Sequence, residues 1–372
     1  MEGLLFLSFP VCVTDPSPQF FMASCPGGAP SPSAAAGLSP TGGAYVYSLF
    51  GTCSSNHMAM LLTSASILRQ TMPTHPVVAM LSPNCATEAT LRALRQHAIE
   101  AVCVPRIGLA NVKCEDAARQ RRGYFAEHFT KLNIFALQGL RVALYLDSDV
   151  VVLRNIDHVL DQMLGNPRIQ EARTPQGCME AYAGRRWLNT GVWGVRPNAT
   201  LLRGLVAWLG TGQTKCFDGD QSAAERYLML NGAAGRRLDE LLLLHVGYNM
   251  KANQEPVRCL QRQKLPTAAL HAVHFSGTQK PHKLSNYSAR AGREVRARTS
   301  TRKPREKMDA HGQSRQYYAD VVYDPWVDRA WRAWMASWST NRPSAGGDHR
   351  VVGDGHEQAA GPGVHRSSKG SG

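Results

Sequence analysis

The feature that most constrains this chain is an apolar run that leads directly into two aspartates. Residues 142–146 read Val-Ala-Leu-Tyr-Leu and are followed by Asp147, Ser148 and Asp149. Such a run is typical of a buried strand, and open α/β sheets bind ligands beyond the carboxyl ends of their strands. Two carboxylates this close repel each other unless positive charge compensates. We therefore expect Asp147 and Asp149 to share a divalent cation, because a simple surface turn would not require an apolar strand to lead into both acids.

Strands and helices alternate along the part of the chain that precedes these aspartates. Strands are expected over residues 44–50, 75–81, 101–104 and 142–146, and helices over 56–69, 87–97 and 124–140. Alternation of this kind indicates a mostly parallel sheet with helices on both faces. The sequence therefore predicts an α/β fold, as a single doubly wound, Rossmann-like domain with a helical C-terminal extension and disordered ends.

Composition divides the 372 residues into five segments. They are a low-complexity or targeting segment over 1–43, the α/β domain over 44–285, a basic linker over 286–316, a Trp-rich helix over 317–340 and a disordered tail over 341–372. Segments rich in Pro, Gly, Ser and Ala bury too little apolar surface to order themselves. In the fourth segment, Trp331, Trp334 and Trp338 share one helical face, which predicts a helix docked on the domain.

The net charge of +14 does not by itself indicate a nucleic-acid-binding protein. Residues 286–316 hold nine basic and three acidic residues, so this segment alone accounts for +6. A charge run is most often solvated, and aromatic residues are not interleaved with this one, so nucleic acid is not the expected partner. An accessory contact of this segment with RNA, DNA or acidic lipid is kept as an alternative. No run of about 18–20 apolar residues occurs, so no ordinary transmembrane helix is expected.

The cysteines form no recognisable pattern. Nine occur, an odd number, with irregular spacing and without a Cys-x-x-Cys pair. This argues against a zinc ribbon and against a small disulfide scaffold. We expect free thiols, either buried in the core or incidental.

A second group of residues capable of chemistry lies far downstream. His274 follows an apolar pair, so it is expected at the end of a short strand, where a neutral imidazole can bind a metal. Gly277 follows, and then Lys280, whose compact cation suits a phosphate. A lone histidine is more often a core residue. With the aspartate pair available upstream, the order His, Gly, Lys indicates a metal–diphosphate site instead.

Five short motifs occur in an order that resembles glycosyltransferase family 8, the glycogenin and galactinol synthase relatives with a GT-A fold. They are Lys131-Leu132 sixteen residues before Asp147, Asp147-Ser148-Asp149 with the following Asn155-Ile156-Asp157, Asn189-Thr190-Gly191-Val192, Asp220-Gln221, and His274-x-x-Gly277-x-x-Lys280-Pro281. The resemblance covers the chain from about Tyr45 to Pro281. Each motif alone has little specificity for the family, whereas all five in this order are specific.

The resemblance implies a retaining glycosyltransferase that moves a hexosyl group from a UDP-sugar to an acceptor. Asp147, Asp149 and His274 would be the ligands of a divalent cation, usually Mn²⁺. Lys280, Gly277 and Asp147 would lie at the diphosphate, and Lys131, Asn189, Asp220 and Gln221 would line the donor sugar and the acceptor approach. Metal and lysine would stabilise the charge that develops on the leaving diphosphate. The family pattern implies front-face attack by the acceptor, with the departing phosphate oxygen as base.

The first strand departs from the family pattern. Gly51-Thr52-Cys53 stands where the family carries an Asn-Asp or Gly-Asp pair followed by Tyr. The uracil is therefore assigned to Phe50 and Thr52. No acceptor tyrosine of the glycogenin type is found, so the acceptor is left open among carbohydrate, polyol, lipid and protein. The compartment, cytoplasmic or Golgi and secretory, is also left open, and a homodimer is one oligomeric state considered.

A haloacid-dehalogenase-type phosphatase is the alternative function. Asp147 would be its nucleophile, and Gly219-Asp220 with Glu225 would imitate its distal acidic motif. That nucleophile normally opens its domain, whereas two or three α/β units precede Asp147 here. This alternative also leaves His274 and Lys280 without a role.

Overall fold

The computed structural model describes most of the chain between residues 42 and 341. The described residues are 42–108, 127–137, 139–175, 188–212, 219–232, 240–252, 256–276, 307–308, 314–315 and 325–341. Across these residues, no helix combines the length and the apolar character needed to cross a membrane.

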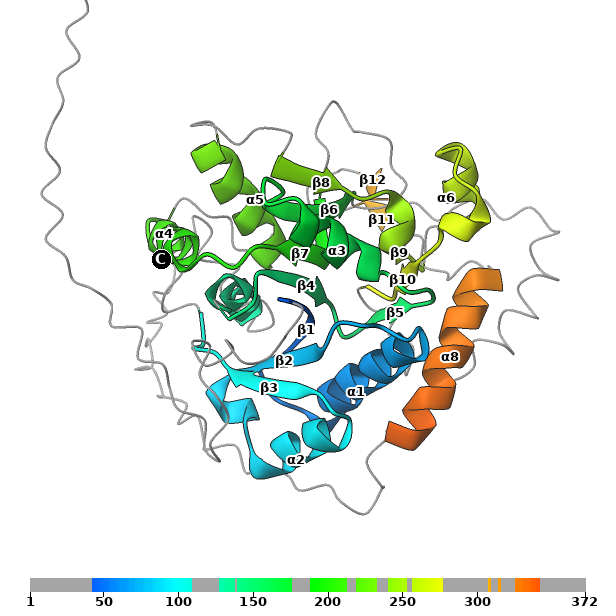
Figure 1. Ribbon diagram of the computed structural model, residues 1–372, viewed down its shortest axis with the longest axis horizontal. Helices are drawn as coiled ribbons and strands as arrows, with labels where there is room; N and C mark the ends of the chain where they lie inside the picture. Colours follow the sequence, from blue (N-terminus) through cyan, green and yellow to red (C-terminus); the bar gives the residue numbers. More distant parts are fainter. Residues whose placement is uncertain are drawn as a thin grey trace, which may run out of the picture. The chain divides into compact units, whose positions relative to one another are not determined.

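A seven-stranded sheet forms the centre of the fold (Figure 1). In spatial order its strands are β3 (Glu100–Cys103), β2 (Val77–Leu81), β1 (Gly43–Leu49), β4 (Val142–Leu146), β7 (Leu188–Val195), β6 (Glu171–Pro175) and β8 (Leu241–Leu243). The first four strands are parallel. β7 is antiparallel to both β4 and β6, and β8 is parallel to β6. The sheet is therefore mixed, with its parallel half built from the first half of the chain.

Helices cover both faces of this sheet, because its strands are apolar on both sides. Along β1, Tyr45 and Tyr47 belong to one core cluster, and Ala44 and Val46 belong to the cluster on the opposite face. The first cluster includes residues of α1 (Ser55–Gln70), α2 (Glu88–Gln96) and α3 (Asp157–Gly165). The second includes residues of η5 (His128–Ala136), α4 (Ala199–Leu209) and α5 (Gly219–Gly232). The prediction of a doubly wound α/β domain is confirmed.

One predicted element has a different helical type. Within the α-helix expected over residues 124–140, the structure has a 3-10 helix, η5, and residues 124–126 lie outside the described part. The Nδ2 group of Asn133 donates to the carbonyl oxygen of Thr130 at 2.8 Å. A side-chain bond to a carbonyl three residues earlier competes with regular α-helical bonding. Periodicity alone does not distinguish the two helical types.

A smaller three-stranded sheet lies beyond the carboxyl end of β4 and positions the candidate site. Its order is β5 (Val150–Val152), β10 (Ala272–His274) and β9 (Met250–Lys251), with β10 antiparallel to β5 and parallel to β9. His274 is the last residue of β10, as the sequence predicts. The segments flanking this sheet include η8 (Val246–Tyr248), α6 (Pro256–Arg262) and η9 (Thr267–Ala269).

The tryptophan stripe lies on α8 (Pro325–Asn341), which packs beside α1 in Figure 1. Trp334 is fully buried, and Trp338 and the partly buried Trp331 belong to the same core cluster, which also contains residues of β5 and β10. The Ser337 hydroxyl donates to the carbonyl oxygen of Thr63 on α1. The helix therefore packs against the same core cluster as β5 and β10 of the small sheet.

The short strands β11 (Lys307–Met308) and β12 (Ser314–Arg315) pair with each other.

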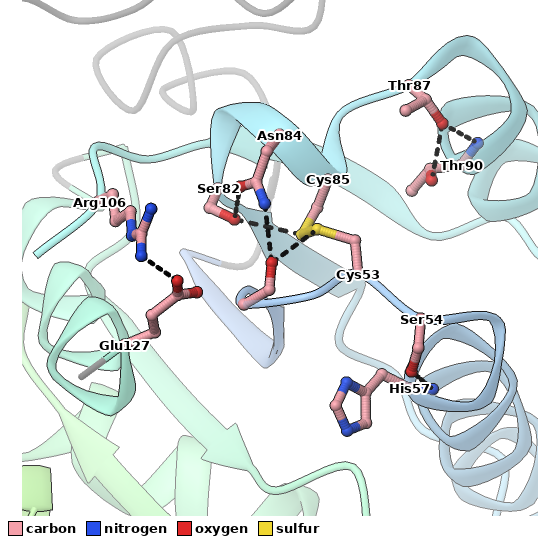
Figure 2. Close-up of a disulfide and its surroundings, with 11 residues drawn as sticks. Cys53, Ser54, His57, Ser82, Asn84, Cys85, Thr87, Thr90, Arg106 and Glu127 are labelled. Carbon is pink, nitrogen blue, oxygen red and sulfur yellow. Dashed lines mark hydrogen bonds and ion pairs between the residues drawn. A yellow bond between two sulfur atoms is a disulfide. The ribbon is translucent and has the colours of Figure 1, made fainter. Parts of the chain in front are cut away.

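The expectation that the cysteines are free thiols is wrong for several of them. Cys53 and Cys85 form a disulfide with Cα atoms 5.2 Å apart (Figure 2), and Cys103 and Cys259 are also disulfide-bonded. Cys53 follows β1 and Cys85 ends η2 (Pro83–Cys85), which follows β2. β1 and β2 are neighbours in the sheet, so the loops that follow them meet although the cysteines are 32 positions apart in the sequence. The spacing of the cysteines in the sequence does not reveal that Cys53 and Cys85 are close in the fold.

Candidate functional site

Asp147, Asp149 and His274 form the group of acidic and imidazole side chains best suited to a metal ion. One potential ligand atom of each lies within 4.8 Å of the others. Nε2 of His274 is 3.3 Å from Oδ1 of Asp149 and 3.7 Å from Oδ2 of Asp147. Asp149 and His274 are both 4% exposed, whereas the Asp147 side chain is 30% exposed. A ligand could therefore reach the group from the side of Asp147.

The local backbone explains why these three residues meet. After β4, a turn closes with the N–H of Val150 donating to the carbonyl oxygen of Asp147 at 2.9 Å, and β5 begins. In the small sheet, Val150 is paired with His274, and the N–H of Phe275 donates to the carbonyl oxygen of Asp149 at 3.0 Å. The antiparallel β5–β10 pair thus places the end of β10 on the turn that carries both aspartates.

Gly191 makes room for the His274 ring. A Cβ atom on Gly191 would lie 2.5 Å from Cε1 and 2.7 Å from Nδ1 of that ring, well inside ordinary contact distance. The histidine is therefore held against bare backbone of β7, with Nε2 directed at two carboxylates. Two carboxylates and one imidazole are a suitable ligand set for a borderline or hard divalent cation. The residues present fit a metal ion.

Lys131 provides a fixed positive charge beside this group. Its Nζ atom is 3.0 Å from Oδ1 of Asp147, 3.5 Å from Oδ2 of Asp220 and 3.1 Å from the hydroxyl of Thr190. It also lies 4.2 Å from the centre of the Tyr145 ring. Burial lowers the pKa of Lys131, but the charges of Asp147 and Asp220 outweigh it and raise the pKa above its usual value. The ammonium group is therefore charged at neutral pH.

The predicted residues Asn189, Asp220 and Gln221 belong to the same network. Nδ2 of Asn189 donates to Oε1 of Gln221 at 3.0 Å. Asp220 accepts from the Thr190 hydroxyl at 3.0 Å, and its other oxygen is 3.9 Å from Nδ1 of His128. Because Asp220 and Gln221 lie in the first turn of α5, this helix and β7 together form one wall of the site.

The residues predicted to hold the base lie in the loop after β1. Phe50 is half-buried with its ring 6.1 Å from that of His128, and Thr52 is exposed. Figure 2 shows how the loop is fastened: Asn84 donates to the carbonyl oxygen of Gly51 at 2.7 Å beside the Cys53–Cys85 disulfide. Phe50 connects to the network through His128, because His128 approaches Asp220. Gly277 and Lys280 lie outside the described residues.

Three residues near the site were not identified from the sequence. Thr190 lies inside a recognised motif, so its position could have been noticed. Asn249 contacts the His274 ring from a loop with no pattern of its own. Lys251 pairs with His274 in the sheet register, so the two side chains lie on the same face. Burial lowers the pKa of Lys251, and in the part of the chain that the structure describes no acidic partner is found for it.

Solved structures similar to this one include several glycosyltransferases. GlyE from Streptococcus pneumoniae TIGR4 shares 15% identity, with 80% of this chain and 62% of GlyE covered and a TM-score of 0.45. The galactosyltransferase LgtC, in complex with donor and acceptor sugar analogues, shares 15% identity over 70% of this chain and 97% of LgtC, with a TM-score of 0.41. Mouse xyloside xylosyltransferase 1 shares 11% identity over 64% of this chain and 99% of that protein, with a TM-score of 0.42.

This chain thus corresponds to about 62% of the length of GlyE. No protein-family model matches the sequence, and no curated protein matches it.

Proposed function

We propose that this protein is a retaining glycosyltransferase of the family 8 type, which transfers a hexosyl group from a UDP-sugar to an acceptor with the help of Mn²⁺. The observation that carries the proposal is the convergence of Asp147, Asp149 and His274 at the carboxyl end of β4. Two carboxylates and one imidazole would hold a divalent cation, and that cation would supply stabilisation to a negatively charged diphosphate. The acceptor is a carbohydrate, polyol, lipid or protein.

In this proposal Asp147, Asp149 and His274 hold the cation. When bound, the cation supplies Lewis-acid stabilisation to the diphosphate leaving group. Lys131 keeps a positive charge next to Asp147, so the carboxylate is already oriented before the donor arrives. Asn189, Asp220 and Gln221 line the sugar, and Phe50 and Thr52 hold the uracil.

Two lysines are assigned to the diphosphate. Lys280 retains the role that the motif implies. Lys251 is added because it shares a face with His274 and because a desolvated ammonium, which has no acidic neighbour among the described residues, gains from an incoming anion. Together they would offset the negative charge that grows on the departing UDP as the anomeric C–O bond breaks.

The phosphatase alternative receives no support from the geometry. Its nucleophile would be Asp147, but Oδ1 of that residue pairs with Lys131 and Oδ2 faces His274. The phosphatase mechanism also gives His274 no function. The transferase proposal uses every residue of the group.

The disulfides indicate the kind of cellular compartment in which the protein works. Cys53, Cys85, Cys103 and Cys259 are disulfide-bonded, and structural disulfides persist mainly in oxidising compartments. We therefore favour the Golgi and secretory pathway over the cytoplasm. Alkylation of the native protein before and after reduction, followed by mass spectrometry, tests this: all four thiols blocked before reduction would contradict it.

The central experiment measures UDP release from UDP-glucose, UDP-galactose and UDP-glucuronic acid with added Mn²⁺ and no acceptor. Donor hydrolysis needs no knowledge of the acceptor. We expect release from at least one donor, abolished by chelation and restored by Mn²⁺. Absence of release from all three, together with Mg²⁺-dependent hydrolysis of a phosphate monoester, would replace the transferase with the phosphatase.

A further inference from the structure

The hydrogen bonds around His274 determine which of its ring nitrogens carries the hydrogen. Nδ1 of His274 lies 2.9 Å from Oδ1 of Asn249. Asn249 is 2% exposed and belongs to a chain of side-chain amides that runs through Asn189 to Gln221. Because an amide has one end that donates and one that accepts, the orientation of each member fixes the next.

Two backbone N–H groups set the direction of this chain. The N–H of Gly191 donates to the Asn189 side chain at 2.7 Å, and a backbone N–H can only donate, so the atom it meets is the carbonyl oxygen Oδ1. The N–H of Thr190 points in the same way at Oε1 of Gln221, at 3.4 Å. Nδ2 of Asn189 therefore donates to Gln221, and Oδ1 of Asn189 is available as an acceptor on the other side.

Asn249 must then present its NH₂ group to Asn189. Its Nδ2 lies 2.7 Å from Oδ1 of Asn189 and 2.9 Å from the Thr174 hydroxyl oxygen. The remaining end of Asn249 is its carbonyl oxygen, which can only accept. His274 consequently bears its hydrogen on Nδ1, and in the neutral ring the lone pair lies on Nε2, which faces Asp147 and Asp149.

We infer that Asn249 is a positioning residue, which holds His274 as the Nδ1–H tautomer so that Nε2 is presented to a divalent cation at Asp147 and Asp149. The inference rests on the proposed metal-dependent transfer. An acceptor on the distal nitrogen fixes the ring orientation and makes the ligating nitrogen more basic, and its loss typically weakens metal binding about 10–100-fold. The amide chain also connects the metal ligand to Gln221, on the wall assigned to the sugar.

The first measurement needs no variant. In the protein without added metal, ¹⁵N-labelled histidine and long-range ¹H–¹⁵N correlation identify the protonated nitrogen of each ring, and the His274 signal is assigned by its absence in His274→Ala. We expect a hydrogen on Nδ1 of His274, as the hydrogen bond to Oδ1 of Asn249 requires. A ring that carries its hydrogen on Nε2 and none on Nδ1 would overturn the inference.

The second measurement is the Kd of Mn²⁺ by calorimetry. Asn249→Ala should weaken binding by about tenfold or more, whereas Asn249→Asp keeps an acceptor for Nδ1 and should weaken binding less than Asn249→Ala. Asn155→Ala is the matched control, because Asn155 also bonds through both ends of its amide, to Met72 and Asp157, but away from the metal ligands. It should leave the Kd of Mn²⁺ unchanged.

A folded Asn249→Ala protein that binds Mn²⁺ like wild type would overturn the inference. If that variant fails to fold, the position of the hydrogen on the wild-type His274 ring and the Mn²⁺ affinity of Asn249→Asp still test the inference.

Failure of this inference can be distinguished from failure of the proposed function. If the tautomer and the affinities are as expected but no UDP-sugar is consumed, Asn249 positions a metal ligand in a protein with another activity.

Discussion

The ammonium group of Lys131 lies 3.0 Å from the carboxylate of Asp147, although the two residues come from different elements, η5 and the end of β4. The same ammonium is 3.5 Å from Asp220. A carboxylate already paired with lysine on one oxygen, and directed at His274 with the other, is held in one orientation. The Asp147 carboxylate is thus fixed beside Asp149 and His274, the other two members of the candidate metal site.

Replacing Lys131 with methionine should destabilise the fold. Lys131 is 4% exposed, and removing one member of a buried ion pair costs about 3–5 kcal/mol because the partner charge is left uncompensated. Urea unfolding of Lys131→Met against wild type measures the loss. We expect Mn²⁺ to raise the melting temperature of Lys131→Met more than that of wild type, since the metal supplies the missing positive charge. Equal shifts would show that Lys131 and the metal do not share Asp147.

Asp149→Asn should abolish Mn²⁺-dependent UDP release and leave the fold intact. An amide oxygen offers a dipole where the carboxylate offers a full charge, and lost electrostatic stabilisation of this type costs about 3 kcal/mol or more at the transition state. Asp161→Asn is the control, because its carboxylate is 63% exposed on α3. Asp149 is not a metal ligand if the folded Asp149→Asn protein keeps more than about half of the wild-type rate, which corresponds to under about 0.5 kcal/mol.

Gly191→Ala should weaken Mn²⁺ binding through crowding of a ligand. The added methyl group would approach Cε1 of the His274 ring to 2.5 Å, so the ring must leave its present position. Gly165→Ala provides the matched control, because a Cβ at Gly165 meets no atom within 4 Å. The Kd of Mn²⁺ from calorimetry should rise about tenfold for Gly191→Ala and stay unchanged for Gly165→Ala. Equal affinities in the two variants would mean that His274 does not bind the metal.

Removing the Cys53–Cys85 disulfide should lower the stability of the oxidised protein. The bond closes a loop across 32 positions, and restricting the unfolded chain in this way is worth roughly 2–4 kcal/mol. Urea unfolding of the Cys53→Ser/Cys85→Ser protein, without reductant, measures the effect. The Kd for UDP should rise as well, because Phe50 and Thr52 belong to the loop that the bond fastens. An unchanged Kd for UDP would show that this loop does not bind the uracil base.

Acid should destabilise the protein through His271. Burial lowers the pKa of His271 to about 4, helped by His158, His245 and Arg154, whereas the unfolded chain keeps a value of about 6.5. Between these values the unfolded state binds more protons, so the free energy of unfolding falls as the pH drops through this window. His271→Phe preserves the ring that stacks on Tyr248 at 4.3 Å and removes the titration.

Urea unfolding at several pH values between about 7 and 4.5 compares the two proteins across that window. The wild type should lose more stability on acidification than His271→Phe. Parallel pH dependences would assign the acid sensitivity to other groups.

Local sequence determined much of the α/β architecture. β4 was predicted with the bounds that the structure has, because its five apolar residues are bounded by charge and need burial on both faces. The same reasoning located α1, α2 and the other parallel strands. The sequence also predicted that Asp147, Asp149 and His274 lie together, and the structure places ligand atoms of all three within 4.8 Å of one another.

Only the tertiary structure decided which distant residues meet. The Cys53–Cys85 bond follows from β1 and β2 being neighbours, and the need for Gly191 follows from the His274 ring lying against β7. Asn249 has no sequence signal at all, because its role consists of bonds to Thr174, Asn189 and His274, which are brought together by three different strands. Local periodicity reports how each segment is buried. The identity of the partners across a sheet depends on strand order and register, which long-range packing sets.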